Sequence, residues 1–346
     1  MRWLARLVGA ATALLPGIAL PQQVSGLELF VQADKGNCAV CHQVPASVLR
    51  SPRADVGPGL DANRMKGWDK ERLRVLLEDP LPGNPETVMP PYGRHLILEP
   101  SEIDRVADFL LSLPPFAEDE SASESHGLPR QTVTEGISPA SRAADAIEAG
   151  RRLWLRKFGK NRSLAGCFPN GGRRIAAAYP QYDPRLKRVV TLETAINQCL
   201  KSHGQPMLDA GDPDTMGAVL AYLRSLSEGQ TIAIRVQGAE AKARLDEGRR
   251  LYFTRMGQQS FACATCHVRS AGRHFGGSVL PASAGSAVYW PYFRGGKAET
   301  LQVRVRTCLD RMGAAAYPAG SDELASIEYY LASLANGVRL RPNSPR

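Results

Sequence analysis

Two absences limit what this sequence can be. Beyond residue 20 it has no apolar run long enough to cross a bilayer, which excludes a further membrane-spanning helix. It has only seven cysteines in 346 residues, and neither of its Cys-x-x-Cys pairs has a second such pair nearby to complete a tetrahedral zinc site. The composition is otherwise ordinary, with 43% hydrophobic and 22% charged residues, so we expect most of the chain to fold.

Two copies of a Cys-x-x-Cys-His motif are the most informative feature of the chain. The copies are Cys38-Ala-Val-Cys41-His42 and Cys263-Ala-Thr-Cys266-His267. In this motif both thiols form thioether bonds to a haem, and the adjacent histidine binds the iron from one side. The sequence therefore predicts two covalently bound haem c groups. Two separate zinc half-sites are the alternative.

The N-terminal sequence predicts export, and export changes what the positive charge means. Arg2 and Arg6 precede an apolar run over residues 7–20 that Pro16 interrupts, a pattern typical of a secretory signal peptide. We therefore expect a periplasmic protein. Its formal net charge of +9 then favours an anionic substrate or an acidic redox partner over nucleic acid. A solvated basic surface without a specific partner is the alternative.

One helical pattern occurs three times. Each copy has apolar residues at i, i+3, i+7 and i+10, which places one apolar face on a helix. The copies are Ile103, Val106, Leu110 and Leu113; Met216, Val219, Leu223 and Leu226; and Leu324, Ile327, Leu331 and Leu334. Upstream of each, a glycine is followed by an aromatic residue at i+4: Gly26 and Phe30, Gly150 and Trp154, Gly248 and Tyr252. We expect each glycine to let an entry helix pack closely on its closing helix. Ser101 with Asp104 predicts a capping-box-like start to the first closing helix.

The repeats predict a mostly α protein with three c-type cytochrome-like units, of which two bear haem and the middle one does not. The expected segments are a signal peptide (1–25), a first cytochrome unit (26–113), a flexible linker (114–144), a haem-less unit (145–226), a short linker (227–242), a second haem-bearing unit (243–338) and a loose tail (339–346).

Three cysteines lie outside the haem motifs. Cys167 stands where the middle unit would carry its motif, and Cys199 follows later in the same unit. A unit without haem has a reduced core, and in an exported protein a disulfide between these two would stabilise it by roughly 3–4 kcal/mol. Two buried free thiols are the alternative. Cys308 is then the odd cysteine, either an intermolecular link or a reactive thiol.

The first haem needs a second iron ligand. Met89 lies in Val-Met-Pro-Pro-Tyr-Gly before the closing helix, and the two prolines fix an extended loop that can direct its thioether towards iron. A His/Met pair raises the reduction potential and suits electron transfer. His95 is the nearest rival ligand, and a role as core filler is the alternative for Met89.

The third unit has no such loop, but Cys308 takes a corresponding place. Cys308 lies 26 residues before Leu334, and Met89 lies 24 before Leu113. We therefore expect Cys308 to be the distal ligand of the second haem, with Met312 and His274 as competitors. Arg304, one turn earlier on a predicted helix, would favour a thiolate and could clamp an oxyanion. A solvated basic face is the alternative for Arg304, and the more probable state of Arg306 and Arg311.

Several stretches in both halves of the chain resemble a known family. GNCAVCH and NPETVMPPYGRHLILEPSEIDRVADFL make residues 26–113 similar to SoxX. VVTLETAINQC, GRRLYFTRMGQQSFACATCH, RVRTCLDR and GSDE make residues 145–338 similar to SoxA. These are the two cytochrome subunits of the Sox thiosulfate-oxidising system. The chain resembles a SoxX–SoxA fusion whose middle unit is like that of family members lacking one haem.

The resemblance implies an L-cysteine S-thiosulfotransferase. Thiosulfate would be joined oxidatively to a cysteine of a SoxY-like carrier in a SoxYZ complex, and two electrons would pass to a soluble cytochrome c. Cys263, Cys266 and His267 would hold the active-site haem, with Cys308 as a distal cysteine found as a persulfide and Arg304 beside it. Cys38, Cys41, His42 and Met89 would hold the electron-transfer haem. A plain dihaem electron carrier and a dihaem peroxidase or gas sensor are the alternatives.

Overall fold

The computed structural model describes residues 23–118 and 139–342. Most of the predicted signal peptide, the centre of the predicted linker and the last four residues lie outside this part. The helices are α1 (Gly26–Val31), α2 (Lys70–Glu78), α3 (Pro100–Leu111), α5 (Pro139–Leu155), α6 (Leu192–Ser202), α7 (Ala218–Ser225), α8 (Ala239–Phe253), α9 (Ser283–Tyr289), α10 (Leu301–Arg311) and α11 (Asp322–Leu334). The prediction of a mostly helical fold is confirmed. None of the described helices has the length and apolar character needed to span a membrane.

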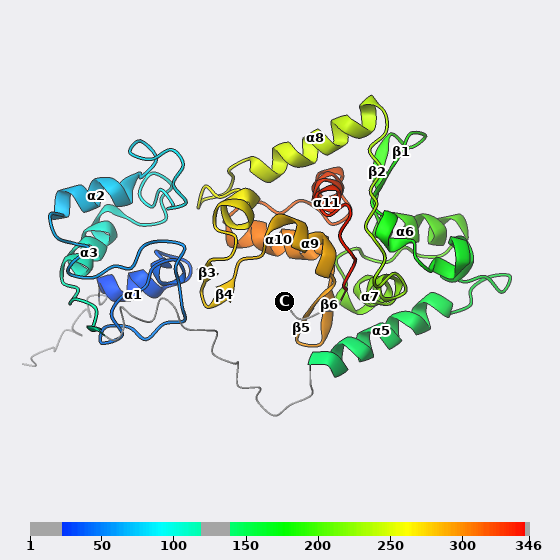
Figure 1. The fold of residues 1–346 in the computed structure, drawn as a ribbon, viewed down its shortest axis with the longest axis horizontal. Coiled ribbons are helices and arrows are strands. Elements are labelled where there is room, and N and C mark those ends of the chain that lie inside the picture. Colours follow the sequence, from blue (N-terminus) through cyan, green and yellow to red (C-terminus); the bar gives the residue numbers. More distant parts are fainter. Residues whose placement is uncertain (1–22, 119–138, 343–346) are drawn as a thin grey trace, which may run out of the picture.

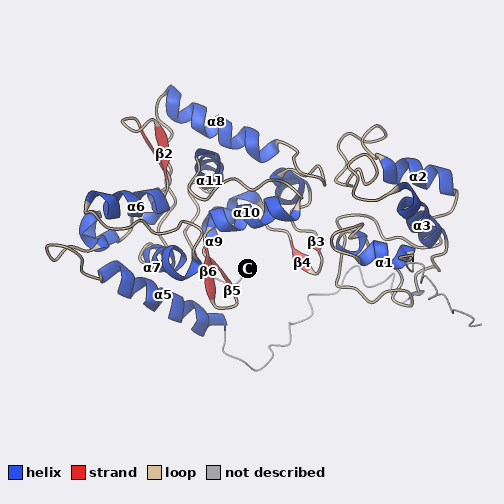
Figure 2. Cartoon of the chain, turned by 180° about the vertical axis from the view of Figure 1, so that it is seen from behind, coloured by secondary structure: helices blue, strands red, loops and turns tan. Residues whose placement is uncertain are grey.

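The strands form three antiparallel hairpins of two strands each. They are β1 (Gln181–Asp183) with β2 (Arg188–Val190), β3 (His274–Phe275) with β4 (Ser278–Val279), and β5 (Tyr292–Arg294) with β6 (Lys297–Glu299). Figure 2 shows how small this strand content is beside the helices.

Three helix pairs cross where a glycine allows it. A Cβ atom on Gly26 would overlap the carbonyl oxygen of Arg105 on α3. Similar overlaps would occur between Gly150 and Ala218, and between Gly248 and Ser326. The pairs α1 with α3, α5 with α7, and α8 with α11 therefore pack backbone to backbone at these points. The predicted glycine contacts are present at all three crossings.

The predicted apolar stripes are buried with few exceptions. All four residues of the first stripe and the first three of the third are buried, but Leu334 is 43% exposed because it ends α11 at the surface. The start of α3 also differs from expectation. Its capping box joins Glu99 to Glu102, because Pro100 occupies the first helical position, and the expected pair of Ser101 and Asp104 does not form it.

The core is divided in two along the chain (Figure 1). Residues 26–113 enclose their own cluster around Phe30. The described residues 139–342 contain three clusters, and the main one joins segments far apart in the sequence, because Trp154 of α5 belongs to it together with Tyr252 of α8. The predicted tail is not loose at its start: Leu340 is 1% exposed, packs in a cluster with Ile232 and Tyr329, and donates its backbone N–H to the carbonyl of Gln230.

Two of the hairpins are each followed directly by a helix with the same type of N-terminal cap. The β1–β2 hairpin leads into α6, which Thr191 caps, and the β5–β6 hairpin leads into α10, which Thr300 caps. Each threonine accepts a hydrogen bond from the backbone of the first helical turn. Cys199 and Cys308 therefore lie at matching places on α6 and α10.

Candidate functional site

The first Cys-x-x-Cys-His motif forms a single helical turn. The backbone N–H of Cys41 and that of His42 both donate to the carbonyl of Cys38, so both thiols and the imidazole leave one short segment. His42 Nδ1 lies 2.8 Å from the carbonyl oxygen of Pro58. Burial lowers the pKa of His42, so the ring is neutral, donates from Nδ1 and keeps Nε2 as the atom that can bind iron. The ring packs on Gly57, where a Cβ would overlap it.

The second motif repeats this arrangement. Residues 265–269 form one helical turn, and His267 Nδ1 lies 2.8 Å from the carbonyl oxygen of Pro281. The hydroxyl of Ser283 donates to the carbonyl of His267 and pairs with the hydroxyl of Tyr252 at 2.6 Å. A carbonyl partner on Nδ1 fixes the tautomer and orientation that iron binding through Nε2 requires.

The four motif thiols fit thioether attachment of haem. Burial raises the pKa of Cys38, Cys41 and Cys263 to about 12 and that of Cys266 to about 11. They are therefore neutral at physiological pH. In the described parts of the chain, neither motif belongs to a compact set of three metal-ligating side chains. The donor set thus fits haem, and the zinc alternative lacks its further ligands.

Met89, the predicted second ligand of the first haem, lies near the first motif. It packs, half-buried, against the cluster that contains Cys38. Its rival His95 points elsewhere, because His95 Nδ1 lies 2.7 Å from the carbonyl oxygen of Gln258 in the other half of the chain. Sequence reasoning missed Met65, which is buried in the same cluster. Its place before α2 carried no motif that could have signalled it.

Cys308 lies beside the second pair of cysteines. It lies close enough to both Cys263 and Cys266 to be, after burial, the largest cause that raises the pKa of either thiol. The competing ligands lie elsewhere: Met312 packs with Phe261 and Leu309, and His274 is paired with Asp55. The structure therefore brings the predicted thiol to the predicted haem motif.

Arg304 stands one turn before Cys308 on α10. Its guanidinium is 4.0 Å from the Glu299 carboxylate, and it faces the ring of Tyr292 at 5.9 Å. The side chain keeps 32% of its surface exposed, so it can still meet an anion from solution. Of the other two arginines, Arg311 is exposed as expected. Arg306 is half-buried with its Nε lacking a partner, so it is not part of a solvated face.

The disulfide between Cys167 and Cys199 is present, which confirms the predicted pairing. Beside it Trp154 donates to the carbonyl oxygen of Gly171 at 2.9 Å and packs against the ring of Phe168 at 5.1 Å. Aromatic side chains and a disulfide therefore fill the centre of the middle unit. His203 is close to the bridge, but the bonded sulfurs are not available as metal ligands.

The two motifs face each other across the junction of the two halves. The backbone N–H of Gly276, in the β3–β4 turn, donates to the carbonyl of Val40 inside the first motif at 3.0 Å. Arg255 donates to the carbonyl of Thr87 in the Met89 loop at 2.6 Å. Cys266 also lies close enough to Cys41 to help raise the pKa of that thiol. The halves thus dock within one chain, beside both motifs.

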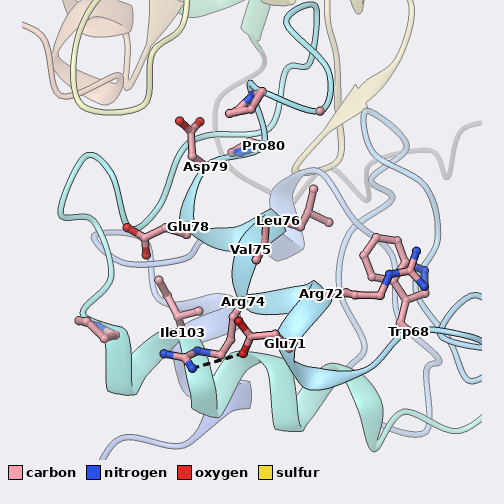
Figure 3. A pocket seen from close by; sticks show the side chains of 13 residues that line it. Trp68, Glu71, Arg72, Arg74, Val75, Leu76, Glu78, Asp79, Pro80 and Ile103 are labelled. Carbon is pink, nitrogen blue, oxygen red and sulfur yellow. Dashed lines mark ion pairs between the residues drawn. The ribbon is translucent and has the colours of Figure 1, made fainter.

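One cavity lies away from both motifs. It measures about 790 Å³ and lies between α2 and α3, with Trp68, Val75, Pro80 and Ile103 in its wall. Figure 3 shows the ion pair of Arg74 with Glu71 at its edge. None of the predicted site residues lines it.

Comparison with known proteins agrees with the geometry. The family described as SoxA/TsdA, cytochrome c domain, matches residues 149–232 and 247–340, just over half of the chain. The L-cysteine S-thiosulfotransferase subunit SoxA of Chlorobaculum tepidum is 33% identical over 195 residues, which cover 56% of this chain and 68% of that protein. Its counterpart in Allochromatium vinosum is 31% identical over 241 residues, which cover 68% of this chain and 85% of that protein.

The fold is similar as well. The crystal structure of SoxXA from P. pantotrophus aligns with a TM-score of 0.51 and 24% identity, covering 57% of this chain and 76% of that one. A cytochrome c domain carries covalently bound haem c, as the cysteine pairs predict. The predicted enzyme class is the one that the relatives' names carry. On these grounds the chain belongs to the SoxA family of c-type cytochromes.

Proposed function

We propose that this chain is a periplasmic fusion of a SoxX-like and a SoxA-like cytochrome that joins thiosulfate to a cysteine of a carrier protein. In this proposal residues 26–113 are the SoxX-like unit, residues 145–226 a haem-less cytochrome-like unit and residues 243–338 the catalytic unit, joined by linkers at 114–144 and 227–242. The carrier is a SoxY-like protein of a SoxYZ complex, and the electron acceptor is a soluble cytochrome c.

The observation that supports the proposal most strongly is the position of Cys308. It lies beside Cys263 and Cys266 with Arg304 one helical turn away. A plain electron carrier needs neither a thiol nor a partly exposed guanidinium at its haem motif. A thiosulfate-oxidising site needs both, because the substrate is a dianion and the new bond joins two sulfur atoms.

Arg304 binds the substrate in this proposal. Its fork of N–H donors can hold two sulfonate oxygens of thiosulfate while the terminal sulfur points towards Cys308. Glu299 is paired more closely with Arg294, at 3.3 Å, than with Arg304, at 4.0 Å, so it neutralises Arg304 only in part.

Cys308 carries the sulfur group. Its thiol and thiosulfate form an S–S bond, with release of one proton and two electrons. The carrier thiol then attacks that bond, takes the thiosulfonate as Cys–S–S–SO₃⁻ and returns the Cys308 thiol with its proton. The net reaction consumes one carrier thiol and one thiosulfate and delivers two electrons to two molecules of oxidised cytochrome c.

Two haem c groups would supply the one-electron chemistry when bound. Cys38 and Cys41 would hold the first with His42 and Met89 as ligands, and Cys263 and Cys266 the second with His267 and Cys308. The protein's contribution is to orient both histidines through the carbonyls of Pro58 and Pro281, and to place the two motifs on either side of one tight junction.

The test uses the haem-loaded full chain with thiosulfate, a carrier peptide bearing one cysteine and oxidised cytochrome c. Mass spectrometry of the peptide is expected to show a thiosulfonate adduct that forms only when all components are present. Cys308→Met should abolish the adduct. Arg304→Lys should raise the KM for thiosulfate by about ten- to a hundredfold, because a bidentate charged contact contributes about 1.5–3 kcal/mol. Arg311→Lys, on the same helix but exposed, is the matched control.

Each alternative has its own outcome. Adduct formation that survives Cys308→Met would overturn the role of the thiol. Electron transfer to cytochrome c without any adduct would leave a plain electron-transfer cytochrome. Ready binding of carbon monoxide to the reduced second haem would indicate an open iron position and favour a peroxidase or gas sensor.

A further inference from the structure

Three ionisable side chains are buried together behind the second haem motif. Arg224 of α7 is 2% exposed, Glu193 of α6 is 1% exposed and Glu328 of α11 is 3% exposed. The Glu328 carboxylate accepts a hydrogen bond from Gln302 at 3.0 Å. Thr191 lies near the Glu193 carboxyl, but neither oxygen of Glu193 has a hydrogen-bond partner of normal geometry. A buried carboxylate in that state is costly unless it is protonated or paired.

The charges in this cluster do not balance without a proton. Glu193 faces Arg224, while Glu328 faces Glu193, Arg224 and the neutral Gln302. Arg224 faces both carboxyls and the Tyr292 hydroxyl. One guanidinium can neutralise one carboxylate, so the second carboxyl must hold a proton. Burial raises the pKa of Glu328 well above its usual value and that of Glu193 as well, which agrees with this count.

Arg224 also connects the cluster to the haem motif. Its Nε donates to the carbonyl of Trp290 at 2.7 Å and its Nη2 to that of Ala287 at 2.8 Å, so it binds the C-terminal end of α9. Just before the other end of the same helix stands Pro281, whose carbonyl holds Nδ1 of His267. One short helix therefore lies between the buried charges and the predicted iron ligand, and it also packs on α11, which carries Glu328.

We propose that Glu193 and Glu328 form a proton-binding site that responds to the charge on the second haem, with Arg224 as a positioning residue that acts on His267 through α9. The pair holds one proton when the haem is oxidised and takes a second from solvent when the haem gains an electron. No other bond forms or breaks. A cavity of about 10 Å³ lined by Arg224 and Glu328 has room for at most about one water molecule beside the pair.

This inference rests on the proposed haem at the second motif, and its test measures that haem directly. The reduction potential of each haem in the full chain is measured optically from pH 5 to 9 in the wild type, in the double variant Glu193→Gln with Glu328→Gln, and in the exposed control Glu228→Gln. The two haems are told apart because Met89→His moves the first alone. In the wild type and in Glu228→Gln, the second potential should fall with rising pH over part of the range, by up to about 59 mV per unit.

In the double variant that slope should disappear, because no carboxyl group remains in the cluster to take up the proton. Should this variant fail to fold because Arg224 is left as an unpaired buried charge, the same two substitutions combined with Arg224→Met give the same test. An equal slope in the wild type and in either of these variants would overturn the inference, as would a second potential that does not change with pH in the wild type. A chain without haem at the second motif would instead contradict the proposed function.

Discussion

The disulfide of the middle unit should account for a large share of the stability of residues 139–342. It joins Cys167 to Cys199 across 32 positions of sequence. In the loop-entropy model a crosslink of this span removes about 12 cal/mol/K of entropy from the unfolded chain, which corresponds to about 3.7 kcal/mol at 25 °C. Replacing both cysteines with alanine should therefore lower the free energy of unfolding by about that amount.

The expected shift in midpoint temperature follows from the size of the cooperative unit. The main cluster within residues 139–342 joins helices far apart in the sequence, which suggests that about 200 residues unfold together, and in that range 1 kcal/mol corresponds to about 2–4 °C. The double alanine variant should thus melt about 7–15 °C below the wild type in differential scanning calorimetry of the haem-loaded protein.

A reductant supplies the internal control. Adding dithiothreitol should lower the midpoint of the wild type by a similar amount and leave the double variant unchanged, because it has no bridge to lose. A loss below about 1 kcal/mol in the variant would refute the argument that the crosslink stabilises this part of the chain by restricting its unfolded state. A reductant effect that is equally large in the variant would show that another thiol is responsible.

Three further predictions follow from single contacts. Gly248→Ala should destabilise the protein by about 1–3 kcal/mol in urea unfolding, because its Cβ would overlap the backbone of α11; no change would mean that α8 and α11 can separate freely. Asp212 accepts a hydrogen bond from Thr215, which holds the pKa of its carboxyl below the usual value. Asp212→Asn should therefore lower the free energy of unfolding by about 0.5–2 kcal/mol at pH 7. The difference in stability between wild type and variant should vanish as the pH falls below about 4 through the folded pKa, because Asp212 is then protonated in the wild type as well. A difference that persists in acid would exclude the carboxylate as its cause. Met89→His should lower the potential of the first haem in a redox titration while Met65→Leu should not, and the reverse result would make Met65 the ligand.

Local patterns predicted much of the site because its chemistry is encoded in short spacings. A Cys-x-x-Cys-His segment forms one helical turn wherever it occurs, so the thiols and the histidine come together without long-range information. The glycine and aromatic at i+4 predicted the helix crossings for a similar reason. Prediction was weaker at helix ends: the expected cap at Ser101 was wrong because Pro100 displaces the start of α3. Arg306 could not be placed either, because its neighbours come from other segments.

From the sequence alone one could predict the entry and closing helices, the helix of Cys308, two Cys-x-x-Cys-His motifs, a disulfide between Cys167 and Cys199, and a resemblance of Cys308 to a distal ligand. The tertiary structure shows that the competing candidate ligands have other partners. His95 and His274 make contacts between the two halves of the chain, and Met312 packs in a separate hydrophobic cluster. The tertiary structure also brought Glu193, Arg224 and Glu328 together from three helices. The physical reason is that spacing within one helix fixes neighbours over a few residues, whereas burial and charge pairing depend on side chains from distant segments that only the folded chain brings into contact.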